Sequence, residues 1–348
     1  NGLLRREPVR SRRYRRRCLA ADPGDFWAQA AFSATGRQDD GDHMGYIVGR
    51  EHEDIVRPRV EAGCSLYASR GIFNSNLLYD HQAILLRYMR LPVHLWLPAK
   101  VQHGWAPAYG GEWSNQEEIR INRAPLWVWN SRTFASATRD GMAWAETVGA
   151  PALYEPRLAA VADSVEPDRQ AIIAFPRHSV GPDYVIADGW DAYVRSLFDL
   201  GFSRVSVCLH ANDYRPEVIT AIRSAGAEPV TVGSVYLRDY LLRCMALIAA
   251  HGAVTSDRVC TAGFYAGLVG RPFVVHGRRL EYGTPDPDEG PVADLAWVRQ
   301  EFPEFLVLAN SPHYATSLRE LGMGYVKSAE SLRQLLWGDE NPLTAWKP

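Results

Sequence analysis

Residues 171–179 read AIIAFPRHS, a run of five apolar residues that stops at a proline, an arginine and a histidine. Downstream, short apolar runs of this kind alternate with stretches that carry a helical period over roughly 10–14 residues. Strands are expected at 171–175, 205–209, 229–232, 253–255 and 273–276, and helices at 190–200, 216–225, 237–250 and 262–269. Strands that alternate with helices are typical of βαβ units in a parallel sheet. The second half of the chain is therefore predicted to be a doubly wound α/β domain.

The first half carries a weaker version of the same pattern. Apolar residues recur every three or four positions over 74–90, which predicts a helix. Short apolar runs follow at 93–97 and 99–102, the second of which predicts a short strand, and the run at 126–129 predicts a buried strand. Pro151, Pro156 and Pro167 mark the junction between the halves. We predict an α/β protein of two Rossmann-like doubly wound domains that face a cleft. The expected parts are an arm at 1–20, an N-terminal domain at 21–155, a linker at 156–169, a C-terminal domain at 170–325, and a C-terminal helix and tail at 326–348 that pack back on the N-terminal domain.

Composition excludes several classes of protein. The 348 residues carry 38 Lys and Arg against 40 Asp and Glu, so no overall field attracts nucleic acid. The five cysteines are odd in number and far apart, which excludes a disulfide framework or a CxxC zinc clasp and favours a reducing cytoplasm. The longest apolar stretch, near 240–254, contains Arg243 and is too short to cross a bilayer. We expect a cytoplasmic protein.

The basic residues are concentrated at the start of the sequence. Residues 1–17 contain eight arginines and one acid, Glu7. Like charges at this density repel one another, so the segment is expected to be mobile on its own. It is either a solvated tail or an arm that contacts anionic lipid or an acidic polymer, and a lipid contact would place the protein at the inner face of the membrane. Nucleic acid is not an expected partner, because no stacking aromatics continue the basic stripe.

Polar residues follow the predicted strands of the second half. Ligands of α/β folds bind at the carboxyl ends of the strands, so these residues are expected to face the cleft. A helix that starts with small residues at 261–263 exposes backbone N–H groups and the positive end of its dipole to a phosphate. Nearby cations could complete a diphosphate site, although a plain helix cap and surface salt bridges are the alternatives. The candidate phosphate-binding residues are Arg177, His178, Thr255, Ser256, Arg258, Thr261, Ala262 and Gly263.

In the first half, His103 follows a short apolar run and precedes Gly104, which allows close approach of backbone and ligand. A neutral histidine at a cleft edge can act as a general base near pH 7. Glu112 is the second candidate base. The alternatives are a histidine satisfied by local backbone and a carboxylate that faces solvent. The candidate substrate-binding residues are Gly104, Trp105, Asn130, Arg132 and His210, whereas Asp80 and His81 are expected to have a surface or packing role.

Motifs for other chemistries are absent from the sequence. It contains no GxGxxG, GxxxxGK[ST], GxSxG or HExxH. The Asp-x-Asp pairs at 40–42 and 286–288 do not follow a convincing strand, so we interpret them as loop acids. The histidines do not fall at metal-ligand spacing. We predict no metal and no cofactor other than an activated substrate.

Six short motifs carry a resemblance to a family. VQHGW at 101–105, LWVWNSR at 126–132 and VGAPALY at 148–154 resemble bacterial capsule and surface-polysaccharide glycosyltransferases of the GT-B fold. VTSDR at 254–258, TAGFY at 261–265 and GRPFVV at 270–275 do so too. The order of the motifs is also similar to that of CDP-glycerol glycerophosphotransferases. The resemblance covers about residues 100–276.

The resemblance implies metal-independent transfer from a nucleotide-activated donor, such as a nucleotide sugar, to a glycan or lipid-linked acceptor. It implies that the N-terminal domain holds the acceptor and the C-terminal domain the donor. His103 matches the family's HG histidine, and Thr255, Ser256 and Thr261 match its phosphate-side residues. The segment 256–258 departs from the family's acidic-rich pattern, so the resemblance does not identify the donor.

Two alternative functions stay open. One is a polysaccharide pyruvyltransferase-like enzyme, whose late Arg-His motif is similar to 256–258, although Val259 and Cys260 stand here where its histidine is expected. The other is a non-catalytic GT-B-like protein that binds a nucleotide sugar or a glycan. Binding of one nucleotide with turnover would favour a transferase, and binding without turnover would favour the binding protein.

Overall fold

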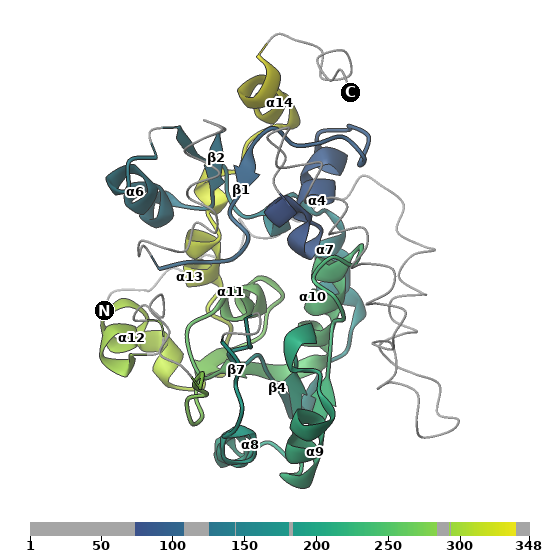
Figure 1. The fold of residues 1–348 in the computed structure, drawn as a ribbon, viewed down its shortest axis with the longest axis vertical. Helices are drawn as coiled ribbons and strands as arrows, with labels where there is room; N and C mark the ends of the chain where they lie inside the picture. Colours follow the sequence, from purple (N-terminus) through teal and green to yellow (C-terminus); the bar gives the residue numbers. More distant parts are fainter. Residues whose placement is uncertain are drawn as a thin grey trace, which may run out of the picture.

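The computed structural model describes residues 74–107, 125–142, 144–180, 184–283, 292 and 294–338. Two separate parallel sheets organise these residues, one in the upper and one in the lower part of Figure 1. The basic arm, Glu112 and both Asp-x-Asp pairs lie outside the described residues. The prediction of an α/β protein with parallel sheets is confirmed.

The larger sheet has five parallel strands in the order β6-β5-β4-β7-β8. The chain starts in the centre, moves to one edge, and then returns to build the other edge. The strand order therefore reverses between β4 and β7, where open α/β sheets bind their ligands. The strands are β4 (Asp168–Ala174), β5 (Arg204–Cys208), β6 (Glu228–Val230), β7 (His251–Ser256) and β8 (Phe273–Val275).

Helices cover both faces of this sheet because successive residues of a strand point to opposite sides. Ile172 of β4 packs in one apolar cluster with α8 and α9, whereas Ile173 packs in another with α10 and α11. This is the doubly wound arrangement predicted for the second half. The helices are α8 (Trp190–Leu197), α9 (Pro216–Ser224), α10 (Tyr240–Ala250) and α11 (Thr261–Leu268).

The smaller sheet belongs to the first half and has three short parallel strands in chain order. They are β1 (Lys100–Val101), β2 (Leu126–Val128) and β3 (Ala145–Thr147), and α6 (Ser131–Arg139) joins the last two. A strand order that never reverses is not doubly wound, so that expectation is not met in the described part of this half. The apolar run at 93–97 forms a turn, in which the Leu95 amide donates to the Pro92 carbonyl.

The helix expected at 74–90 forms as two pieces, η2 (Asn74–Asp80) and α4 (His81–Tyr88). Tyr79 and Asp80 separate them, with φ angles of 60° and 65°. This left-handed conformation is uncommon outside glycine and costs free energy. Tertiary contacts hold it, since the Tyr79 amide donates to the Val235 carbonyl and the Asp80 carboxylate pairs with Arg87.

The junction between the halves is helical rather than extended. The predicted linker at 156–169 contains α7 (Arg157–Ser164), which packs against α10. A single apolar cluster runs through both halves and includes Trp127 and Trp129 of the first half and Phe264 and Phe273 of the second. Short 3-10 turns complete the connections: η3 (Pro151–Tyr154), η4 (Phe198–Leu200), η5 (Ala211–Asp213), η6 (Pro303–Leu306) and η7 (Met323–Tyr325).

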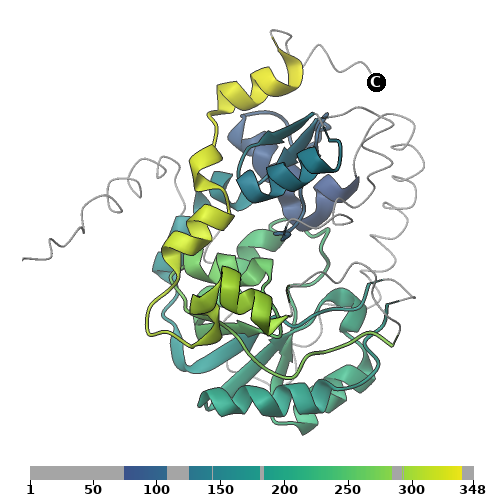
Figure 2. The same ribbon diagram turned by 90° about the vertical axis from the view of Figure 1, so that its left-hand side faces the viewer.

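The C-terminal helices return the chain to the first half, as the yellow segment in Figure 2 shows. They are α12 (Leu295–Glu301), α13 (Tyr314–Glu320) and α14 (Ala329–Trp337). α13 packs on α11, and the Leu321 carbonyl after it accepts from the Ala150 amide. In the expected tail at 326–348, Arg333 donates to the Met89 carbonyl of the first half. Among the described residues, no helix combines the length and apolar character needed to cross a membrane.

Candidate functional site

The carboxyl-terminal edge of the larger sheet gathers polar side chains from three strands. Arg177 and His178 follow β4, His210 follows β5, and Arg258 follows β7. The imidazole rings of His178 and His210 are stacked, with centroids 4.2 Å apart and planes 17° apart. The structure thus brings together two predicted site residues that are distant in the sequence.

Two buried carboxylates hold the loop that carries His178. Asp257 accepts a hydrogen bond from the Arg177 amide at 3.0 Å, and Asp213 accepts one from the Ser179 amide at 2.7 Å. The Ser179 hydroxyl also donates to Asp213, at 2.5 Å. The amides on either side of His178 are therefore fixed from the two neighbouring strands. Neither aspartate is among the site residues predicted from the sequence, although both stand in loops that follow a predicted strand.

The two arginines of the site have different surroundings. The Arg258 guanidinium forms a paired contact with Asp257, with its Nη2 3.1 Å and its Nε 3.3 Å from the two carboxylate oxygens. Its positive charge is thus partly compensated within the protein. The Arg177 guanidinium lies over the Tyr282 ring, 3.6 Å from the centroid, in a cation–π contact. Both side chains are largely buried at the same edge of the sheet, where an anion would be poorly solvated.

His103 of the first half completes a group of three histidines. Burial, together with smaller electrostatic contributions from Lys100 and His178, lowers the pKa of His103 to about 4. Burial also lowers the pKa of His178, and it lowers the pKa of His210 to about 3 with a contribution from His178. The ring of His103 is stacked with that of Tyr79, with centroids 6.4 Å apart, and an electrostatic interaction relates it to His178. All three imidazoles are neutral at pH 7 and can accept a proton.

A hydrogen bond joins the loop of His103 to the start of α11. The Trp105 amide donates to Thr261 Oγ1 at 2.9 Å. A Cβ atom at Gly104 would lie only 3.3 Å from the same oxygen, so the glycine allows this close approach. The first turn of α11 therefore lies against the first half at the His103 loop.

Several predicted phosphate-binding residues make close contacts within the protein. Thr255 is buried within the sheet, and its hydroxyl donates to the Val274 carbonyl of β8 at 2.9 Å. Ser256 is equally buried, and its Oγ accepts from the Arg258 amide at 3.4 Å. Gly263 is required by packing, because a Cβ there would lie 2.7 Å from the Phe273 ring. Its amide donates to the Cys260 carbonyl, and Ala262 is buried.

Trp105 and Asn130, which we expected to bind substrate, instead contact Glu320 of α13. The indole of Trp105 is buried against Phe264, and its Nε1 donates to Glu320 at 3.1 Å. Asn130 caps α6 by accepting from the Thr133 amide at 2.9 Å, and its amide group donates to the Glu320 carbonyl. A buried polar group must find partners inside the protein, and α13 supplies them.

Arg132, the third of these residues, also joins the two halves. Its guanidinium pairs with Glu301 of α12 at 2.9 Å and lies 3.6 Å from Glu320. The same group lies over the Phe302 ring. This side chain is therefore occupied between α6, α12 and α13 rather than directed at the histidine group.

Metal ligation finds no support in the part of the chain that the structure describes. No three His, Cys, Asp or Glu side chains there are grouped so that they could hold an ion. The three site histidines are related by ring stacking and electrostatic interaction instead. Their arrangement suits proton transfer and contact with a polar ligand.

No protein-family profile and no curated protein sequence matches this chain. Among solved structures, the chain is similar to a UGT transferase from Siraitia grosvenorii in complex with UDP. The identity is 12%, the TM-score is 0.26, and the match covers 83% of this chain and 78% of that chain. A TM-score this low does not establish a shared fold.

Proposed function

We propose that this protein is a glycosyltransferase that moves a sugar from a nucleotide-activated donor to a hydroxyl group of a glycan or lipid-linked acceptor. The observation that carries the proposal is the gathering of His178, His210, Arg177 and Arg258 where the strand order of the larger sheet reverses, with the His103 loop hydrogen-bonded to the start of α11. The motifs at 101–105 and 254–265 supply the reaction class through their resemblance to surface-polysaccharide glycosyltransferases. Transfer of glycerol phosphate, which the order of the motifs also favours, would use the same site.

The donor's diphosphate would lie between the two arginines and the start of α11. A leaving nucleoside diphosphate carries negative charge that must be stabilised as the bond to the sugar breaks. Arg177 provides a cation held on Tyr282, and Arg258 provides one that Asp257 orients. The start of α11 adds the positive end of its helix dipole. These groups supply stabilisation without a metal ion.

His103 would act as the base from the first half. The acceptor O–H proton passes to the neutral imidazole while the acceptor oxygen bonds to the anomeric carbon. The bond from that carbon to the diphosphate oxygen breaks, and the nucleoside diphosphate leaves with the electron pair. Attack from the side of the ring opposite the diphosphate inverts the anomeric centre. The second candidate base, Glu112, remains a prediction from the sequence.

The experiment that tests the proposal is a thermal-shift screen with UDP-, CDP-, GDP- and CMP-sugars and with phosphoenolpyruvate, followed by an assay for free nucleotide. We expect one nucleotide sugar to raise the Tm by several degrees and to release nucleotide when a glycan acceptor is added. Stabilisation by phosphoenolpyruvate alone would favour a pyruvyltransferase-like enzyme. Stabilisation without turnover would favour a binding protein, and no response to any compound would contradict the proposal.

Arg177→Met and Arg258→Met test the anion site directly. Loss of a charge-assisted hydrogen bond to phosphate costs about 1.5–3 kcal/mol, so each variant should bind nucleotide roughly 10- to 150-fold more weakly. Arg195→Met is the matched control, because that arginine is exposed on α8 and pairs with the exposed Asp191. Nucleotide affinity that is unchanged in both site variants would remove these residues from the donor site.

A further inference from the structure

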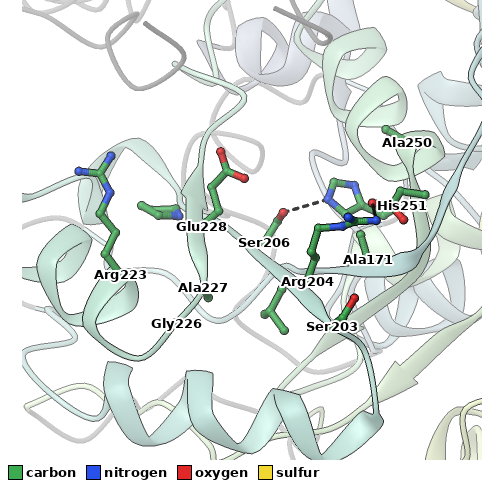
Figure 3. A pocket seen from close by; sticks show the side chains of 13 residues that line it. Ala171, Ser203, Arg204, Ser206, Arg223, Gly226, Ala227, Glu228, Ala250 and His251 are labelled. Carbon is green, nitrogen blue, oxygen red and sulfur yellow. Dashed lines mark hydrogen bonds and ion pairs between the residues drawn. The ribbon is translucent and has the colours of Figure 1, made fainter. Parts of the chain in front are cut away.

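A second group of reactive side chains lies at the opposite edge of the larger sheet. A cavity of about 590 Å³ is present at the amino-terminal ends of β4, β5, β6 and β7. Ser206 and His251 line it and are joined by the hydrogen bond drawn in Figure 3. The histidine group described above lies at the carboxyl ends of the same strands, so the two sites are separated by the length of the sheet.

The hydrogen bonds of His251 determine which ring nitrogen carries the proton. Nδ1 lies 2.7 Å from the Leu247 carbonyl oxygen, which can only accept, so Nδ1 must be the donor. In the neutral ring Nε2 is then unprotonated. Ser206 Oγ lies 3.0 Å from Nε2 and therefore donates its O–H to it. Burial lowers the pKa of His251, which keeps the ring neutral at pH 7.

This arrangement is the one that a nucleophilic serine needs. The serine proton faces a neutral base, and a second hydrogen bond orients that base. Here a backbone carbonyl takes the orienting role that a carboxylate often has. Ser206 is close to fully buried in the middle of β5, yet it borders the cavity.

The charged side chains around the pair indicate the kind of ligand. Arg204 is two residues before Ser206 on β5, lies on the same side of the strand, and pairs with Asp168 of β4. Glu228 of β6 and Arg223 of α9 border the cavity as well, and within the described residues neither side chain forms a hydrogen bond or ion pair. A cavity of this volume with charges of both signs suits a small polar molecule.

We propose that Ser206 and His251 form a second reactive site, in which Ser206 is a nucleophile toward small polar carboxylic esters. The Ser206 proton passes to His251 Nε2 as Oγ bonds to the ester carbonyl carbon. The ester C–O bond then breaks, the alcohol leaves with the proton from His251, and the acyl group stays on Ser206. Water, deprotonated by His251, hydrolyses this ester to the carboxylic acid and restores the serine. Arg204 is the cation nearest to Ser206 in the sequence, and it would stabilise the negative charge that develops on the carbonyl oxygen.

The test uses the full chain and a fluorophosphonate, a phosphonylating reagent that reacts with activated serines and releases fluoride. We expect one adduct by intact mass, located on Ser206 by peptide mapping and absent from Ser206→Ala. His251→Gln should slow labelling by at least about 100-fold, the usual contribution of a general base. Ser203→Ala is the matched control and should label normally, because Ser203 lines the same cavity with its hydroxyl near the Gln170 carbonyl rather than an imidazole. The rate of p-nitrophenyl acetate hydrolysis should change in the same way: lost in Ser206→Ala, reduced in His251→Gln and unchanged in Ser203→Ala.

The wild-type protein alone can overturn the proposal, so the result does not depend on the folding of a variant. No adduct on Ser206 of the native chain would show that its bond to His251 is structural. Equal labelling of Ser203 and Ser206, or labelling that persists in a folded His251→Gln, would show the same. The outcome is independent of nucleotide-sugar binding, because the two sites occupy opposite ends of the strands.

Discussion

The backbone amide of Trp105 donates a hydrogen bond to Thr261 Oγ1, although 156 residues separate the two. Trp105 lies two residues after His103, and Thr261 begins α11. A single side-chain hydroxyl therefore ties the candidate base of the first half to the helix that would face the donor's phosphates. In the proposed function, the distance between base and donor would depend on this contact.

Thr261→Val should weaken both the fold and the site. The valine has nearly the same shape but leaves the Trp105 amide without its partner, which should cost about 1 kcal/mol of unfolding free energy. We also expect lower transfer activity, because the His103 loop loses its attachment. Urea unfolding and free-nucleotide release measure the two effects. Thr261→Ser keeps the hydroxyl and should behave like the wild type; a valine variant equal to the serine variant would show that the bond is dispensable.

In the pH profile of kcat/KM, the decrease on the acid side should lie near pH 4 rather than near the usual pKa of histidine. A base must be unprotonated, and burial lowers the pKa of His103 to about 4, so kcat/KM should fall only as the pH approaches that value. His103→Ala should reduce turnover by about 100- to 10,000-fold and leave nucleotide affinity nearly unchanged. The profile is measured by free-nucleotide release in wild type and in Glu112→Gln. A limb near pH 6.5, or one that disappears in Glu112→Gln, would exclude His103 as the base.

His81 should make the fold sensitive to acid. It is fully buried, neither ring nitrogen has a partner among the described residues, and burial lowers its pKa to about 3, with a smaller contribution from His103. The unfolded chain therefore takes up this proton first, and stability that is present above pH 6.5 is lost as the pH falls toward the folded-state value. The loss is about 2 kcal/mol between pH 6.5 and pH 5 for one such histidine. Urea unfolding across this range measures the effect. The free energy of unfolding of His81→Leu should depend on pH less steeply than that of the wild type, by the equivalent of one proton, whereas a change at the exposed His94 should not reduce the slope.

Arg157 should be an important charge for stability. It pairs with the buried Glu155 at 2.8 Å and with Asp239 at 2.9 Å, and so joins α7 to the loop before α10. Burial alone would raise the pKa of Glu155, but hydrogen bonds and charge from Arg157 outweigh it and lower the pKa overall. Arg157→Met would remove the Arg157 hydrogen bonds and leave Arg87, 3.1 Å from the carboxylate, as the remaining partner of Glu155, which should cost about 1.5–3 kcal/mol by chemical denaturation. Arg195→Met, which removes an exposed pair, should cost less than about 0.5 kcal/mol, and equal costs would contradict this role.

Gly322 should not tolerate a side chain. Its φ angle is 78°, and a Cβ there would lie 1.7 Å from the Trp129 carbonyl oxygen of the first half. Gly322→Ala should therefore lower the unfolding free energy by at least about 3 kcal/mol, because backbone must move on both sides. Gly324→Ala, where a Cβ meets no atom within 4 Å, is the control and should change it by less than about 0.5 kcal/mol. Thermal unfolding of the two variants side by side measures the difference.

The spacing of apolar residues along the sequence was sufficient to predict the strands and helices of the larger sheet. Every strand and helix expected between 171 and 276 is present, with ends displaced by a few residues. Buried strands and amphipathic helices are encoded by the spacing of apolar residues over short distances, so no information about distant contacts is needed. The first half was less predictable, because its strands are only two or three residues long and the left-handed residues Tyr79 and Asp80 break a regular apolar period.

The sequence by itself therefore determined the alternation of strands and helices and the polar residues that follow the strands, including His178, His210 and Arg258. Only the tertiary structure decided what those side chains and their neighbours contact. Trp105 and Asn130 donate hydrogen bonds to Glu320, which lies 215 and 190 residues further along the chain. Ser206 and His251, which are also hydrogen-bonded, are 45 residues apart. A periodic pattern reflects the conformation of neighbouring residues, whereas a buried donor or acceptor is satisfied by whichever group the packing of the whole chain places within reach.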